Sequence, residues 1–199
     1  MNTSSDINHL LEIARQIDKQ VRRIRWTNEE LEEKFGRRSA NQILAEGNTF
    51  YMNSCMDLTL ASIFLAQRKG LNPDLVIEEH GKTRGVPFNR AHFVLELPNN
   101  GGAYLNPKTL GLIQIGQGKY PGRQDIPKVR TLRVDGSRID PSRPLYQNLG
   151  FTSLEEALKK LFIGYDIKPN IEKIKRDNTL NNYLRYKRIA ESPLRITLI

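Results

Sequence analysis

The only cysteine of the chain, Cys55, lies in a stretch that could support nucleophilic chemistry, FYMNSCMDLTLASIFLAQRKGLNP. The apolar spacing after Ser54 predicts a helix that begins there and ends at Gly70. A cysteine at the first helical position faces unpaired backbone N–H groups and the positive end of the helix dipole, and both favour the thiolate. We therefore expect Cys55 to have a lowered pKa and to act as a thiol nucleophile. The alternative is a cysteine that packs as a small core residue.

A thiol nucleophile needs a base, and an imidazole exchanges protons near neutral pH. The chain offers His9, His80 and His92. His9 lies off the apolar stripe of the predicted first helix, and His80 stands between a predicted strand and a loop that gives no rigid platform. His92 begins the segment HFVLEL, where strand geometry would hold the ring in place. We expect His92 to be the base; the alternative is a histidine satisfied within the core.

A third side chain usually fixes the tautomer of a catalytic imidazole, and Asn106 in the next predicted strand is the candidate. The residues NNGG between the two strands predict a hairpin. His92 and Asn106 share a face only if the paired positions add to an even number, as when Leu97 pairs with Ala103. A two- or four-residue turn would separate them unless a glycine bulge corrects the register. The alternative is that Asn106, which precedes Pro107, is only a turn residue.

The elements around these residues follow from hydrophobic spacing and from capping residues. Apolar residues three and four positions apart in residues 7–24 predict an amphipathic helix. Capping-box spacing opens two further helices, at Thr27 with Glu30 and at Ser153 with Glu156. Alternating and β-branched residues, separated by turn residues, predict a set of strands. These strands are 74–79, 91–98, 103–107, 112–116 and 129–136.

The order of these elements predicts an α+β fold in a single domain of residues 1–199. A helical extension, residues 1–47, includes a short helix at 38–46. A core of about residues 48–136 holds the cysteine helix and an antiparallel sheet. A basic helical extension, residues 150–199, closes the chain with one or two helices after Pro169.

The composition narrows the class of protein. No apolar run approaches the roughly 18 residues needed to span a bilayer, and the N-terminus does not resemble a signal peptide, so we expect a cytoplasmic protein without membrane association. One cysteine and three histidines give neither a disulfide framework nor a zinc cluster. We expect no metal and no cofactor.

The net charge of +9 is concentrated near the C-terminus. Residues 111–199 hold 17 Lys and Arg against 9 Asp and Glu, which leaves +8 in that part of the chain. Such a surface can attract nucleic acid or an acidic partner, and it can equally be a solvated face. No stacking-aromatic motif or helix-turn-helix pattern accompanies the basic residues.

The segments NSCMDLTLASIFLAQRKGLNPDLVIEE, HFVLEL and AYLNP resemble the core of the transglutaminase-like superfamily, a branch of the papain-like thiol enzymes. The matching positions are Cys55, Asp57, Gly70, His92 and Asn106. The chain departs from the family pattern in three ways. An asparagine replaces the usual aspartate at 106, Asn53 replaces a glycine two residues before the cysteine, and Phe93 replaces a tryptophan after the histidine.

This resemblance implies a papain-like core and an acyl-transfer reaction on amide bonds of a protein or peptide substrate. Cys55 would form a thioester, and water or an amine would resolve it, as in proteases, amidases, deamidases and transglutaminases. The backbone N–H of Cys55 and the side chain of Asn53 or Asn48 would stabilise the oxyanion. Asp57 would stabilise the helix N-terminus. The alternative is an inactive domain of this type whose basic C-terminal half binds an acidic partner or nucleic acid.

Overall fold

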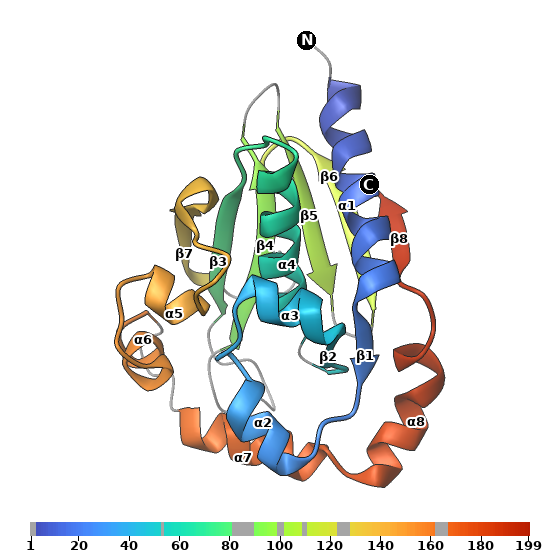
Figure 1. Cartoon of the computed structure of the whole chain (residues 1–199), viewed down its shortest axis with the longest axis vertical. Coiled ribbons are helices and arrows are strands. Elements are labelled where there is room, and N and C mark those ends of the chain that lie inside the picture. The colour runs from blue at the N-terminus through green and yellow to red at the C-terminus, as the bar shows by residue number, and fades with distance from the viewer. Residues whose placement is uncertain are drawn as a thin grey trace.

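The computed structural model describes residues 3–52, 54–80, 90–98, 102–108, 111–122, 128–161 and 167–199. Its centre is a six-stranded sheet in the order β7-β3-β4-β5-β6-β8, with helices across one face (Figure 1). Neighbouring strands are antiparallel except β6 and β8, which are parallel. The strands are β3 (Asp74–His80), β4 (Arg90–Leu97), β5 (Ala103–Lys108), β6 (Leu112–Gln117), β7 (Lys128–Asp135) and β8 (Arg195–Leu198). The predicted α+β class and the five predicted strands are confirmed.

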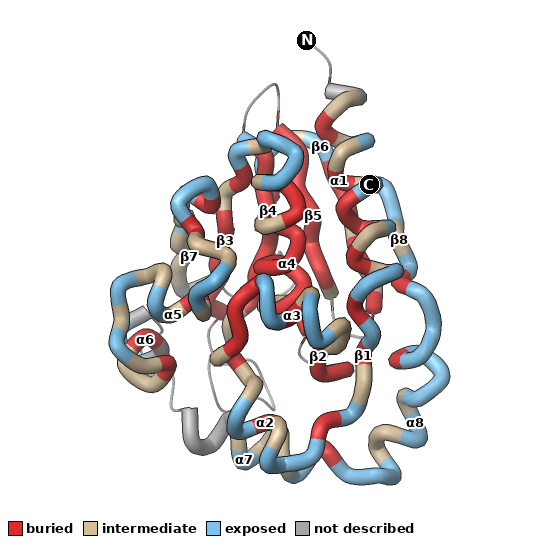
Figure 2. Tube along the Cα trace, in the orientation of Figure 1, coloured by how far each residue is buried: buried red, intermediate tan, exposed pale blue. Residues whose placement is uncertain are grey.

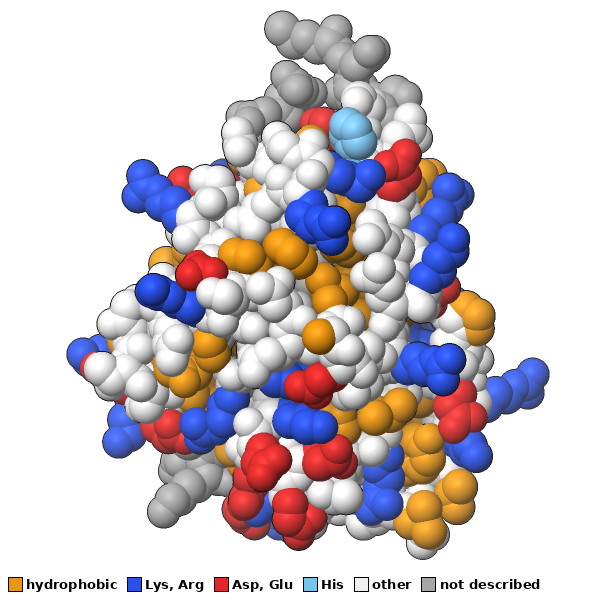
Figure 3. Space-filling model, in the orientation of Figure 1, with side chains coloured by type: hydrophobic (Ala, Val, Ile, Leu, Met, Phe, Trp, Pro, Cys, Tyr) orange, Lys and Arg blue, Asp and Glu red, His pale blue; other side chains and the backbone are white. Residues whose placement is uncertain are grey.

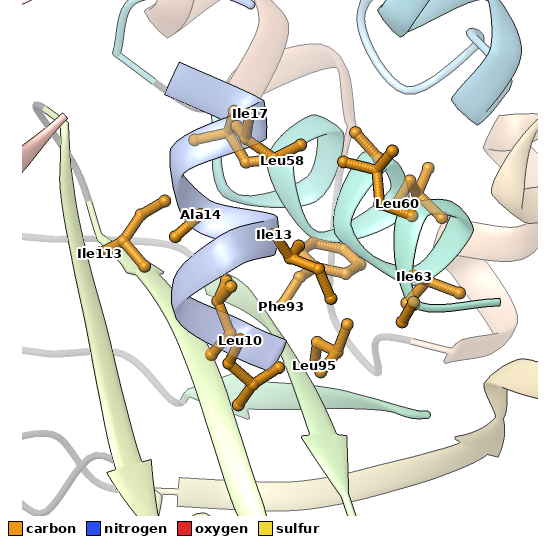
Figure 4. Close-up of a cluster of buried hydrophobic side chains, with 14 of the residues drawn as sticks. Leu10, Ile13, Ala14, Ile17, Leu58, Leu60, Ile63, Phe93, Leu95 and Ile113 are labelled. Carbon is orange, nitrogen blue, oxygen red and sulfur yellow. The ribbon is translucent and has the colours of Figure 1, made fainter. Parts of the chain in front are cut away.

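Two helices, α1 (Thr3–Gln20) and α4 (Cys55–Arg68), pack against the same face of the sheet. The odd-numbered positions of the central strands point toward these helices and form the main core with them. Figure 4 shows this cluster, in which side chains of the two helices meet those of β4 and β6. It includes Leu10, Ile13, Ala14, Ile17, Leu58, Leu60, Ile63, Phe93, Leu95 and Ile113.

The even-numbered positions of the same strands form the opposite face, where a smaller cluster holds Val76, Val94, Tyr104 and Tyr120. Polar residues are buried on this face too, among them Glu78, His92 and Asn106. In Figure 2 the central strands are almost continuously buried. Burial on both faces is unusual for an antiparallel sheet, which commonly leaves one face to water.

The N-terminal part contains two predicted short helices, α2 (Asn28–Lys34), which capping-box spacing indicated, and α3 (Ala40–Glu46), which was expected at 38–46. The Thr27 and Glu30 capping box is complete, and Ser39 forms a second one with Gln42. The predicted first helix, residues 7–24, is wrong at its end: α1 stops at Gln20, and Arg22–Ile24 form β1. The sequence also did not predict β2 (Asn48–Phe50), which pairs in parallel with β1 as a separate two-stranded sheet. Strands of three residues are too short to show a periodic pattern.

The C-terminal part is helical, as expected, but it ends in a strand. From residue 150 onward its helices are α6 (Leu154–Leu161), α7 (Ile167–Asp177) and α8 (Leu180–Ala190). A 3₁₀ turn, η1 (Gly136–Arg138), and a short helix, α5 (Leu145–Asn148), come before it and were not predicted. The expectation that the chain closes with helices is therefore incomplete, because β8 extends the sheet beside β6. No helix among the described residues has the length and apolar character needed to cross a bilayer.

Candidate active site

Helix α4 begins at Cys55, as the sequence predicts, but its first turn is not capped by a hydroxyl. Ser54 has helical backbone angles, and its side chain makes no capping hydrogen bond. The inward-facing residues of α4 are buried against the sheet and α1, so packing rather than a cap fixes where the helix starts. Cys55 is partly buried against the same core.

The sulfur of Cys55 lies in a desolvated position. Burial raises the pKa of the Cys55 thiol to about 11, although the backbone N–H groups of Phe93, Met56 and Cys55 itself act in the opposite direction. The predicted lowering of this pKa is therefore wrong for the resting structure. The thiol is protonated at neutral pH.

The hairpin of β4 and β5 has the register that brings the two other candidates together. Leu97 pairs with Ala103 and Leu95 with Leu105, so His92 and Asn106 lie diagonally on one face. The Nε2 atom of His92 is 2.6 Å from Oδ1 of Asn106. Both side chains are buried. The predicted contact between His92 and Asn106 is present.

This hydrogen bond also indicates the tautomer of His92. The Nδ2 group of Asn106 donates to Oε1 of Gln114 at 3.5 Å, which leaves Oδ1 as the amide atom that faces the imidazole. An amide oxygen only accepts hydrogen bonds, so Nε2 of His92 must carry the proton. In the neutral ring Nδ1 is then the basic atom. Gln114 was not among the predicted site residues, because its contact with Asn106 arises only from the pairing of β5 with β6.

The ladder between β4 and β5 is interrupted next to His92. Two residues beyond the Leu95 and Leu105 pair, the register would place Phe93 opposite Pro107, which has no N–H to donate. Groups from α4 take the vacated positions. The Thr59 hydroxyl donates to the Phe93 carbonyl at 3.1 Å, and the Cys55 sulfur lies against the Phe93 N–H.

This interruption lies between the two parts of the candidate site. Cys55 belongs to the face that α1 and α4 cover, whereas His92 and Asn106 point from the opposite face. A continuous ladder of backbone hydrogen bonds would separate them. The break at Phe93 brings the thiol to the backbone beside His92, at the point where the His92 and Asn106 side chains bridge the two strands.

The two predicted oxyanion donors, Asn53 and Asn48, are not shown at the candidate site. Asn53 lies outside the described residues. The Oδ1 atom of Asn48 accepts from Trp26 Nε1 at 3.0 Å, and its Nδ2 donates to the Glu46 carbonyl at 3.1 Å. Both polar atoms of the Asn48 amide are thus engaged in other contacts, which does not favour Asn48 as an oxyanion donor.

Asp57 lies in the first turn of α4, but its main contact is an ion pair. Its carboxylate accepts hydrogen bonds from the Arg38 guanidinium and, at 2.7 Å, from the Thr49 hydroxyl. Burial raises the pKa of Asp57 against the effect of Arg38. The predicted role at the helix N-terminus is thus secondary to a role in holding α4 against the segment before α3.

Within the described part of the chain, no group of three or more His, Cys, Asp or Glu residues could hold a metal ion. Comparison of the sequence with protein-family models and with curated proteins finds no match. The arrangement of Cys55, His92 and Asn106 is therefore the main indication of what this chain does.

Proposed function

We propose that this protein is a cysteine-dependent acyl-transfer enzyme with a papain-like, transglutaminase-like core. Cys55 is the nucleophile, His92 the general base and acid, and Asn106 the orienting residue. The observation that supports this most is the hydrogen bond between His92 and Asn106 at the strand interruption that the Cys55 sulfur occupies. A helix-borne thiol, a strand-borne imidazole and an orienting amide are the parts that acyl transfer needs.

The reaction begins with a neutral thiol and a neutral imidazole. Nδ1 of His92 accepts the thiol proton as the sulfur attacks the carbonyl carbon of an amide, which gives a tetrahedral oxyanion. The backbone N–H of Cys55 is a donor for this oxyanion. The carbon–nitrogen bond then breaks, and the imidazolium returns the proton to the departing amine. A thioester to Cys55 remains.

Water or a second amine completes the turnover. His92 removes a proton from this second nucleophile, the nucleophile attacks the thioester, and the sulfur leaves and regains its proton. Hydrolysis makes the protein a protease, amidase or deamidase, and attack by an amine makes it a crosslinking enzyme. The substrate class is a protein or peptide, and the scheme needs no cofactor.

The experiment is the rate of Cys55 alkylation by iodoacetamide as a function of pH. We expect wild type to react at neutral pH at least about tenfold faster than His92→Ala, since a base near the thiol offsets a high thiol pKa. Asn106→Ala should fall between them. His9→Ala, which changes a histidine on α1, is the matched control and should react like wild type. Equal rates in wild type and His92→Ala would overturn the proposal.

The second candidate is an inactive domain of the same fold that binds an acidic partner or nucleic acid. The protonated resting thiol favours it, since a cysteine at a pKa of about 11 is a poor nucleophile on its own. Among the described residues, the face of the molecule in Figure 3 shows no continuous basic patch. On the face in Figure 3, Lys and Arg side chains stand at separate places, and acidic side chains gather over α2. Binding that weakens steeply with salt would support this candidate.

A further inference from the structure

A buried glutamate stands beside His92 on the strand that does not carry Asn106. Glu78 of β3 is the direct partner of His92 of β4 in the antiparallel register. Directly opposed residues have Cβ atoms about 4.5–5.5 Å apart and point to the same face. Glu78 has no exposed surface. His92 therefore has Asn106 on one side and a buried carboxyl group on the other.

The contacts of Glu78 keep its carboxyl group on the face that His92 occupies. The Tyr120 hydroxyl donates to Oε2 of Glu78 at 3.2 Å, and Nε2 of His80 is 3.4 Å from the same oxygen. His80 is the last residue of β3 and is itself buried, so the expectation that it lacks a rigid platform is wrong.

The other buried glutamates of these strands belong to different ion pairs. Arg130 is 3.2 Å from the carboxylate of Glu79, which points to the opposite face. Arg133 is 2.6 Å from the carboxylate of Glu96, further along β4. Glu78 is thus the glutamate whose position in the register assigns it to the imidazole of His92.

We propose that Glu78 is a positioning residue that stabilises the imidazolium form of His92 during acyl transfer. This inference rests on the proposed function. The orienting residue Asn106 fixes the ring but carries no charge, and a buried imidazolium is costly without a nearby anion. The Glu78 carboxylate supplies that negative charge from the neighbouring strand.

Several described polar groups lie on the elements packed around His92. On β3 these are Glu78 and His80, and at the start of α4 they are Cys55 and Asp57, whose carboxylate faces Arg38. Tyr120 faces Glu78, and the pair of Glu96 and Arg133 lies further along the sheet. Asn106 on β5, Gln114 on β6 and Thr131, which pairs with Glu78 from β7, are neutral. Of these described groups, Glu78 is the one in the pairing position directly opposite His92.

The test compares Glu78→Gln with Glu79→Gln, an adjacent buried glutamate on the opposite face. The first readout is the alkylation rate of Cys55 by iodoacetamide against pH. We expect Glu78→Gln to slow it about tenfold at neutral pH, the equivalent of one pKa unit, and Glu79→Gln to leave it near wild type. The second readout is the NMR titration of the His92 ring in the Cys55→Ala background. Glu78→Gln should lower the His92 pKa by about one unit.

A restored charge separates electrostatics from a structural effect. Asn106→Asp placed in the Glu78→Gln background returns one negative charge to His92 from the other side, and we expect it to recover most of the lost rate. If Glu78→Gln does not fold, as judged by circular dichroism, Glu78→Asp retains the charge but withdraws it by one methylene. The His92 pKa should then fall by less than about one unit.

The outcomes distinguish the two proposals. Equal alkylation of wild type and His92→Ala overturns the proposed function itself. A reaction that depends on His92, with the same rate and the same His92 pKa in Glu78→Gln and Glu79→Gln, overturns only the role of Glu78. If Glu78→Gln does not fold, an unchanged His92 pKa in Glu78→Asp also overturns the role of Glu78.

Discussion

At the scale of single residues, two effects compete at Cys55. The N–H groups of the first turn of α4 and of Phe93 favour the thiolate, and such dipolar effects are worth about 0.3–2 kcal/mol. Removing the thiolate from water costs several kcal/mol. The cost of burial is the larger effect, which explains the raised pKa of Cys55. In the proposed reaction, His92 therefore acts as a base during attack and is not the partner of a preformed thiolate.

The raised pKa of Cys55 predicts a loss of stability at alkaline pH. The unfolded chain releases the thiol proton near the ordinary value of 9.0, whereas the folded protein holds it until about 11. The folded state therefore binds more protons between these values, and its stability falls as pH rises through that window. We expect the urea midpoint of wild type to drop more between pH 8 and pH 10.5 than that of Cys55→Ala. Equal drops would show that the thiol is not desolvated.

At the scale of elements, the site depends on the junction between α4 and the hairpin. Pro107 ends the hydrogen bonding between β4 and β5, and the carbonyl of Phe93 then needs another donor. Thr59, fully buried one turn after Cys55, is that donor. The same hydrogen bond that satisfies the strand also fixes how far the start of α4 reaches toward His92.

Thr59→Val should test this junction, because valine keeps the shape of threonine and removes the hydroxyl. An unsatisfied buried carbonyl costs about 1–3 kcal/mol, so we expect urea unfolding to show a loss of that size. Ser62→Ala is the matched control, since the Ser62 hydroxyl donates at 2.7 Å to the carbonyl of Leu58 within its own helix. A loss below that of Ser62→Ala would mean that the Phe93 carbonyl finds another partner.

At the scale of the whole molecule, the N-terminal and C-terminal extensions are joined through a buried arginine. Arg23 of β1 donates to the carbonyls of Ala190 at 3.2 Å and Ile189 at 3.1 Å at the end of α8. The segment that follows α8 then runs to the edge of the sheet, where β8 lies beside β6 (Figure 1). Arg23 thus holds the chain at the turn between the last helix and the last strand.

Arg23→Met should release this connection while keeping a side chain of similar length. We expect it to lower the free energy of unfolding by about 3 kcal/mol, because hydrogen bonds to a charged donor are lost. Hydrogen exchange should also speed up at the Arg195 and Ile199 amides, which bond to the carbonyls of Gly111 and Ile115. Arg22→Met, an exposed neighbour on the same strand, is the control. Unchanged exchange at both amides in Arg23→Met would contradict this account.

Local patterns determined the elements that are long or capped. The α1 stripe, the Thr27 capping box, the helix from Cys55 and the five strands were all readable from sequence, since spacing and caps act over a few residues. The capping box predicted at Ser153 is only half formed. The Ser153 hydroxyl accepts a hydrogen bond from the backbone N–H of Glu156 at 3.1 Å. The Glu156 carboxylate, however, accepts from the backbone N–H and the hydroxyl of Thr152 rather than from the backbone of Ser153. Local rules therefore predicted the helix but not the details of its first turn.

By itself, the sequence determined which residue types were available for chemistry and which parity would bring His92 and Asn106 together. Only the tertiary structure decided that this parity occurs, that Pro107 interrupts the ladder beside Cys55, and that Glu78 stands opposite His92. It also reversed the expected pKa of Cys55. Pairing register and burial depend on residues that are distant along the chain, so no local pattern contains them.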